Sequence, residues 1–137
     1  MKSCIIIVFC LFILTGASVY SQQQTNDNSA QGSEKIEMYY FHTSYRCATC
    51  LAVEEQSKMA FEGLYPEKFK SGQASFQAVN IDEESSTDLV ERYKVSGQLL
   101  LLVKGDKTVD LTSQGFLYAR TNPEKLREEI RKAVENL

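Results

Sequence analysis

The sequence predicts an α/β domain in which a mixed four-stranded sheet carries helices on both faces. Strand-like and helix-like segments alternate in the order β-α-β-α-β-β-α over residues 35–137. A β-α-β beginning implies parallel strands joined by a right-handed crossover. Two strands joined by a tight turn near the end imply antiparallel neighbours. A mixed sheet covered by helices satisfies both requirements.

The first strand and the first helix have the clearest patterns. Ile36–His42 (IEMYYFH) is rich in aromatic and β-branched residues, which is typical of a strand buried on both faces. From Cys50 onward apolar residues recur at helical spacing, namely Val53, Ala60, Phe61 and Leu64. Gly63 is the expected helix stop, and Pro66 is expected to open one further short turn.

The middle of the chain repeats the alternation. Ala74–Ile81 (ASFQAVNI) is expected to form the second strand. Several N-cap candidates in residues 82–86 then open a second helix, which ends before Gly97. The continuous apolar run Leu99–Val103 suits a central strand.

The last third predicts a hairpin and a final helix. Residues 104–107 (KGDK) form a tight turn, and Val109 and Leu111 alternate with polar neighbours as in an edge strand. Asn122-Pro123 provides an N-cap residue followed by proline at the first helical position. The apolar face of the last helix is then Leu126, Ile130, Ala133, Val134 and Leu137.

Residues 1–21 have the pattern of a secretory signal peptide, which implies export. Lys2 gives the positive start, Ile5–Leu14 the apolar run, and Ser21 a small residue before cleavage at Gln22. The run is shorter than the roughly 20 residues of a membrane-spanning helix; an uncleaved N-terminal anchor is the alternative. Residues 22–34 are polar and predict a flexible linker, so the domain occupies 35–137. In a Gram-negative bacterium the expected location is the periplasm.

Cleavage after Ser21 would change the cysteine count and the charge. It removes two of the four cysteines and leaves Cys47 and Cys50. An exported chain with one such close pair has no disulfide framework to build. The remaining 14 basic and 18 acidic residues give a formal charge of −4, which does not favour a nucleic-acid partner. No stable membrane insertion is expected after cleavage, and the mature protein is expected to be a monomer.

The Cys-x-x-Cys pair stands at the junction between the first strand and the first helix. The unpaired N–H groups and the positive dipole end of a helix N-terminus stabilise a thiolate there. A thiolate attacks disulfides whereas a thiol does not. The spacing of Cys47 and Cys50 therefore predicts a redox-active dithiol, with an inert, permanently oxidised disulfide as the alternative.

These features together resemble the thioredoxin-like superfamily. Besides the Cys-x-x-Cys, the resemblance rests on Val79–Glu83 (VNIDE) and on the helix ending Tyr93–Gly97 (YKVSG), and it covers 36–137. It implies the thioredoxin-like fold and a thiol–disulfide oxidoreductase. In that activity Cys47 attacks and Cys50 resolves, the partners are protein thiols or disulfides, and no cofactor or metal takes part.

A narrower resemblance and three departures qualify that expectation. Residues 40–50 (YFHTSYRCATC) resemble a group of small exported proteins catalogued as ArsF-type, "nitrophenyl compound nitroreductase subunit". Thioredoxins place a cis proline before the third strand, where this chain has Gly97-Gln98-Leu99. Their buried aspartate is replaced by Phe41 and their tryptophan before the first cysteine by Arg46. Ordinary thioredoxin substrate handling is therefore not implied.

Neighbouring residues suggest further roles with simpler alternatives. Arg46 would favour the Cys47 thiolate, or it is only an exposed surface charge. His42, the one histidine, is a candidate acid–base or metal ligand, but a partly buried histidine hydrogen-bonded at the strand end is favoured. Tyr40 and Tyr45 could line a substrate groove, although aromatic residues beside a strand more often belong to the core.

Two other function classes remain open. Cys47, Cys50 and His42 offer three soft ligands for Cu(I) or for an incomplete zinc site. A non-catalytic thioredoxin-fold module that binds a partner is the other possibility. Haem attachment is excluded at this motif, because Leu51 stands where Cys-x-x-Cys-His requires histidine. Redox cycling of the dithiol would argue against the partner-binding module, whereas stoichiometric metal in the purified protein would favour the metal site.

Overall fold

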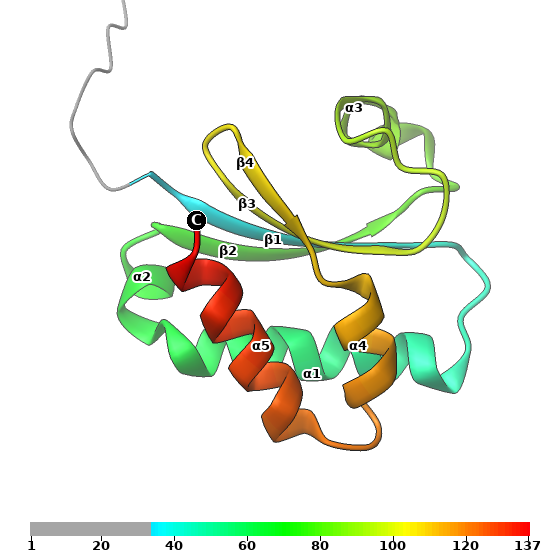
Figure 1. The fold of residues 1–137 in the computed structure, drawn as a ribbon. Helices are drawn as coiled ribbons and strands as arrows, with labels where there is room; N and C mark the ends of the chain where they lie inside the picture. The colour runs from blue at the N-terminus through cyan, green and yellow to red at the C-terminus, as the bar shows by residue number, and fades with distance from the viewer. Residues whose placement is uncertain (1–33) are drawn as a thin grey trace, which may run out of the picture. The chain divides into compact units, whose positions relative to one another are not determined.

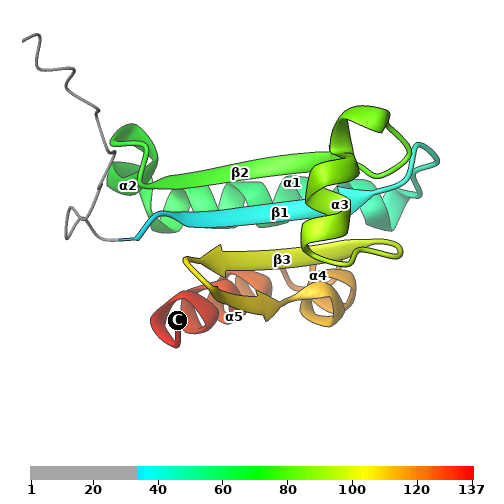
Figure 2. The ribbon, with the colours of Figure 1, turned by 90° about the horizontal axis from the view of Figure 1, so that it is seen from above.

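The computed structural model describes residues 34–137, which form a four-stranded mixed sheet with helices on both faces. The strand order is β2-β1-β3-β4. The strands are β1 (Ile36–His42), β2 (Ala74–Asn80), β3 (Leu99–Lys104) and β4 (Lys107–Asp110). β1 runs parallel to β2 and antiparallel to β3, and β3 runs antiparallel to β4 (Figure 2). The predicted fold class and its thioredoxin-like α/β arrangement are confirmed.

The helices divide between the two faces of the sheet. Figure 1 shows α1, α4 and α5 below the sheet and α3 above it. The helical segments are α1 (Ala48–Leu64), α2 (Pro66–Lys70), the 3₁₀ turn η1 (Glu84–Ser86), α3 (Thr87–Arg92), α4 (Thr112–Tyr118) and α5 (Pro123–Glu135). Residues 1–33, with the predicted signal peptide 1–21 and all but the last residue of the linker 22–34, lie outside the described residues.

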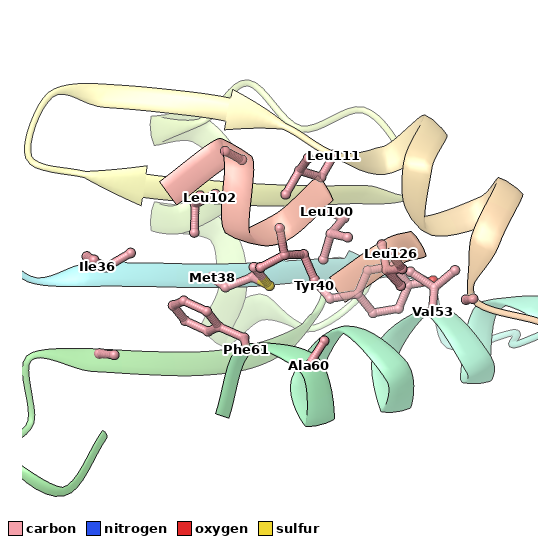
Figure 3. Close-up of a cluster of buried hydrophobic side chains, with 14 residues drawn as sticks. Ile36, Met38, Tyr40, Val53, Ala60, Phe61, Leu100, Leu102, Leu111 and Leu126 are labelled. Atoms are coloured by element: carbon pink, nitrogen blue, oxygen red, sulfur yellow. The ribbon is translucent and has the colours of Figure 1, made fainter. Parts of the chain in front are cut away.

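The larger core lies between the sheet and the helices α1, α4 and α5. Tyr40, Leu100 and Leu102 project from the strands toward Phe61 on α1 and Leu126 on α5, and all five are fully buried (Figure 3). Burying a side chain of this size contributes about 1.5–3 kcal/mol. These contacts hold α1 firmly against β1, and α1 carries the dithiol at its N-terminus.

The opposite face has a smaller core under α3. Tyr39, Phe41 and Leu101 point to this side and pack against Leu89 and Tyr93. Because successive strand residues face opposite sides, β1 contributes to both cores. The prediction that this strand is buried on both faces is confirmed. Phe41, where the resemblance described above would place a buried aspartate, is fully buried in this cluster.

The main correction to the predicted fold is helix α4, which the pattern of apolar residues in the sequence does not predict. Strand β4 ends at Asp110, because its carboxylate accepts the N–H of Thr112 at 2.8 Å and turns the chain. Leu111, predicted to be a strand residue, instead precedes α4 and is buried. The helix has seven residues, too few to show a periodic pattern. A Cβ atom on Gly115 would lie 3.1 Å from Cγ1 of Val53, so glycine lets α4 approach α1 closely.

The predicted boundaries are otherwise close to those observed. α1 continues through Gly63 to Leu64, since the N–H of Tyr65 still donates to the carbonyl of Phe61 at 3.1 Å. The short turn opened by Pro66 is α2. In the turn between β3 and β4, Gly105 has a φ of 58°, which glycine adopts without steric cost.

Lys94 ends α3 in a left-handed conformation, with a φ of 52°. The N–H of Val95 donates to the carbonyl of Val90 at 2.9 Å, and that of Lys94 to the carbonyl of Glu91 at 3.2 Å. This pair of bonds is the Schellman ending, whose left-handed position is usually occupied by glycine because Cβ is unfavourable there.

We expect Lys94→Gly to stabilise the domain. Removing Cβ removes the steric clash that disfavours the left-handed conformation at this position. The free energy of unfolding should therefore increase by about 1 kcal/mol. Urea denaturation followed by circular dichroism measures it. The matched control is Lys58→Gly on the exposed side of α1, where glycine should instead cost about 1 kcal/mol. An equal decrease in the free energy of unfolding in both variants would contradict the left-handed conformation of Lys94.

Candidate functional site

The sheet topology places the dithiol where β1 ends and α1 begins. Cys47 is the N-cap residue of α1, with extended backbone angles of −83° and 163°, and Cys50 lies in the first turn. The two sulfurs are joined in a disulfide, with the Cα atoms 5.0 Å apart. The predicted position of the pair at a strand-to-helix junction is confirmed.

The two sulfurs are in unequal surroundings. Cys47 is exposed, whereas Cys50 is only 3% exposed. The backbone N–H of Cys50 donates to Cys47 Sγ at 3.1 Å, so one otherwise unpaired helix N–H points at the exposed sulfur. An incoming thiolate can therefore reach the Cys47 sulfur, and the helix terminus favours negative charge on it.

Gln98 contacts the buried sulfur. Its amide Nε2 donates to Cys50 Sγ at 3.3 Å. Gln98 immediately precedes β3, and Leu99 of β3 pairs with Phe41 near the end of β1, so the start of β3 and the end of β1 lie side by side (Figure 2). Among residues 34–137 no peptide bond is cis. In the sequence, segment 97–99 differs from thioredoxins by its missing proline. Nothing in the sequence pattern predicts that Gln98 contacts the dithiol.

An open groove has Gln98, but neither cysteine, in its lining. Its volume is about 560 Å³, and its lining includes the loop residues Ser96, Gly97 and Gln98 together with Leu99 and Thr112. Gln98 thus contributes both to the groove and to the surroundings of Cys50.

Arg46 does not present a free charge to Cys47. Its guanidinium forms an ion pair with the carboxylate of Glu54, and both side chains are largely covered. The guanidinium carbon also lies 5.9 Å from the centre of the Tyr40 ring. Arg46 is therefore no simple exposed charge, and Glu54, two helical turns beyond Cys47, compensates its charge. Its effect on the Cys47 thiolate stays a prediction.

We expect Glu54→Gln to lower the pKa of the Cys47 thiol in the reduced protein. The change removes a carboxylate near the site and leaves the Arg46 charge uncompensated, and nearby positive charge favours a thiolate. Thiolate absorbance as a function of pH measures this. Arg46→Gln should shift the pKa in the opposite direction. A pKa that Glu54→Gln leaves unchanged would show that the ion pair does not act on Cys47.

His42 lies at the end of β1 and is buried. Its Nδ1 donates to the carbonyl of Thr43 at 3.0 Å, and its ring is 5.9 Å from that of Tyr40. This matches the favoured expectation of a hydrogen-bonded histidine at the strand end. Within residues 34–137, no three His, Cys, Asp or Glu side chains gather as metal ligands. The structure therefore does not bring His42, Cys47 and Cys50 together as a metal site.

The two tyrosines near the pair differ in exposure. Tyr40 is fully buried, so it belongs to the core and lines no groove. Tyr45 is 87% exposed two residues before Cys47. It is available to a molecule that approaches the exposed sulfur.

Asp82 fixes the loop that leads to Cys47. Its carboxylate accepts the N–H of Ser44 at 2.6 Å, and the amide of Asn80 donates to Ser44 Oγ at 3.0 Å. The Ser44 N–H is also the main reason why the pKa of Asp82 is lowered. The sequence offered residues 82–86 as N-cap candidates for the second helix. Within that range Glu83 is the N-cap residue of η1 and Ser86 that of α3, both without side-chain capping hydrogen bonds.

Comparisons with known proteins give structural likenesses only. No protein-family model matches the chain, and neither does any curated protein. Among solved structures it is similar to one described as a malarial protein, at 15% identity and a TM-score of 0.47, over 72% of this chain and 97% of that one.

Two thioredoxins give similar values. The germline-specific thioredoxin Deadhead of Drosophila melanogaster is 19% identical with a TM-score of 0.41, over 72% of this chain and 81% of that one. Fasciola hepatica thioredoxin is 19% identical with a TM-score of 0.43, over 74% and 83%. The thioredoxin-like fold rests here on the element order and strand pairing described above. No helix within residues 34–137 has the length and apolar character needed to cross a membrane.

Proposed function

We propose that the protein is a thiol–disulfide oxidoreductase in which Cys47 attacks and Cys50 resolves. One observation carries the proposal. The two cysteines form a disulfide at a helix N-terminus, where Cys47 is exposed and Cys50 is buried. The exposed sulfur is the more accessible one to a substrate thiol or disulfide, which supports Cys47 as the attacking residue and Cys50 as the resolving residue.

The reaction balances without a cofactor. The Cys47 thiolate attacks one sulfur of a substrate disulfide, forms a mixed disulfide and releases the other substrate sulfur as a thiolate. The Cys50 thiolate then attacks Cys47 Sγ, closes the Cys47–Cys50 disulfide and releases the second substrate thiolate. The substrate gains two electrons and the dithiol loses two. The reverse sequence oxidises a substrate dithiol through the same intermediate.

Trapping of the intermediate tests the proposal. A Cys50→Ser protein should accumulate mixed disulfides through Cys47, because no second thiolate can resolve them. Non-reducing electrophoresis and mass spectrometry identify the adducts, with the Cys47→Ser/Cys50→Ser protein as the matched control. Adducts that form on Cys50 of a Cys47→Ser protein, and not on Cys47, would reverse the assigned roles.

The choice of partner follows from the surface next to Cys47. Tyr45 is exposed there and Cys47 is open to solvent, which suits a protein thiol or disulfide as substrate. The proposal does not depend on the narrower resemblance to the ArsF-type group, because that resemblance covers only residues 40–50.

Export is part of the same proposal, and residues 1–21 support it through their sequence pattern. N-terminal sequencing of the protein recovered from its native cell tests it. A mature chain that begins at Gln22 is expected. A chain that retains Met1 would contradict signal cleavage.

A further inference from the structure

The two sulfurs of the dithiol each accept one hydrogen bond, but from different kinds of donor. Cys47 Sγ accepts from a backbone N–H, a contact that any N-cap cysteine in this geometry can make. Cys50 Sγ accepts from the Gln98 side chain at 3.3 Å. The second contact therefore depends on the residue type at position 98, and substitution can remove it without altering the backbone.

We propose that the Gln98 amide stabilises the Cys50 thiolate and thereby promotes the second, resolving step of the exchange. The inference rests on the proposed function, because it assigns a role within the same reaction. In that step the Cys50 thiolate attacks Cys47 Sγ in the mixed disulfide, the Cys47–Cys50 bond forms and the substrate sulfur leaves with the electron pair.

Burial makes such a donor necessary. Cys50 is 3% exposed, and an apolar environment disfavours a charged sulfur and raises the pKa of a thiol. A hydrogen bond to a charged acceptor is about twice as strong as one between neutral groups. The Gln98 contact therefore becomes stronger when Cys50 changes from disulfide to thiolate, and it offsets part of the cost of burial.

No other side chain takes this role in the described part of the chain. The charged and titratable groups around the pair include the Arg46–Glu54 ion pair, His42 at the end of β1, the exposed Tyr45 and Arg120 after α4. Arg120 contacts the hydroxyl of Thr49 at 3.5 Å. Within residues 34–137, Gln98 is the only side chain that hydrogen-bonds to Cys50 Sγ.

The first experiment measures the pKa of Cys50 in a Cys47→Ser protein by thiolate absorbance. Gln98→Met keeps a similar length without a donor and should raise this pKa by about one unit, which is a tenfold change in the dissociation constant. Gln98→Glu places a like charge near the thiolate and should raise it further. Gln73→Met, exposed at the opposite end of the sheet, is the control and should leave it unchanged.

The second experiment measures resolution with both cysteines present. The reduced protein is mixed with a small aromatic disulfide, which forms an adduct on Cys47. Cys50 then displaces this adduct, and absorbance follows the aromatic thiolate that is released. In Gln98→Met the fraction of Cys50 present as thiolate should be about tenfold smaller, but a thiolate of higher pKa is more nucleophilic. The resolving step should therefore slow about threefold. Formation of the adduct on Cys47 should not change.

The outcomes separate this inference from the proposed function. Unchanged Cys50 pKa and resolution in both Gln98 variants would overturn the role of Gln98, while adduct formation on Cys47 would still support the oxidoreductase. A wild-type protein that forms no adduct would overturn the proposed function itself. Circular dichroism identifies any variant that fails to fold. If Gln98→Met fails to fold, the same pKa and resolution measurements on Gln98→Glu test the role of Gln98.

Discussion

Replacing Cys47 with serine is expected to reduce thiol–disulfide exchange to the uncatalysed rate. Serine at this position keeps the N-cap hydrogen bond to α1, because its hydroxyl accepts the same N–H. It cannot form a mixed disulfide, and the remaining Cys50 sulfur is buried. The measurement is the rate at which the protein catalyses reduction of a protein disulfide by a small dithiol.

The control for this variant is its stability. The disulfide closes a short loop, since its cysteines are three positions apart, and such a bond contributes about 2 kcal/mol by the chain-entropy argument. The reduced wild type and Cys47→Ser should therefore have similar free energies of unfolding. Full exchange activity in Cys47→Ser would place the nucleophile elsewhere.

Replacing Phe61 with alanine is expected to lower the free energy of unfolding by about 3–5 kcal/mol. Phe61 is fully buried, and its ring lies 5.1 Å from that of Phe69 and 5.6 Å from that of Tyr65. The side chain thus packs α1 against both the sheet and α2. Domains of this size have total stabilities of about 5–15 kcal/mol, so the loss is a large fraction.

Chemical denaturation followed by circular dichroism tests this prediction. The matched control is Met59→Ala on the same helix, where the side chain is 59% exposed and the effect should stay within about 0.5 kcal/mol. A similar small effect for Phe61→Ala would mean that this core is not packed as described. Molecules that remain folded should keep their exchange activity, because Phe61 does not contact the dithiol.

The strands and the dithiol could be predicted because their signals are local. Ile36–His42 is rich in aromatic and β-branched residues, and Leu99–Val103 is an apolar run of strand length. The glycine of the 104–107 turn marks the hairpin between β3 and β4. The spacing of Cys47 and Cys50 alone indicates a dithiol. Helix α4 could not be predicted, because its formation depends on the close approach of Gly115 to Val53 and Leu100, which lie far away in the sequence.

The surroundings of the dithiol could not be predicted for the same reason. Glu54 compensates Arg46 only because α1 brings its second turn back toward the loop. Gln98 reaches Cys50 only because β3 begins where β1 ends, which is a matter of strand register. Asp82 contacts Ser44 across the ends of two parallel strands. Each pair joins residues whose types are ordinary and whose proximity comes from the fold.

The reduction potential of the Cys47–Cys50 pair tests the central claim most directly. The protein is equilibrated with glutathione buffers of known potential, and the oxidised and reduced fractions are read by mass spectrometry. A cycling dithiol should give a value between about −270 and −120 mV, and its place in that range would assign the protein as reductant or oxidant. A pair that stays oxidised below about −300 mV would behave as a structural disulfide and would contradict the proposed function.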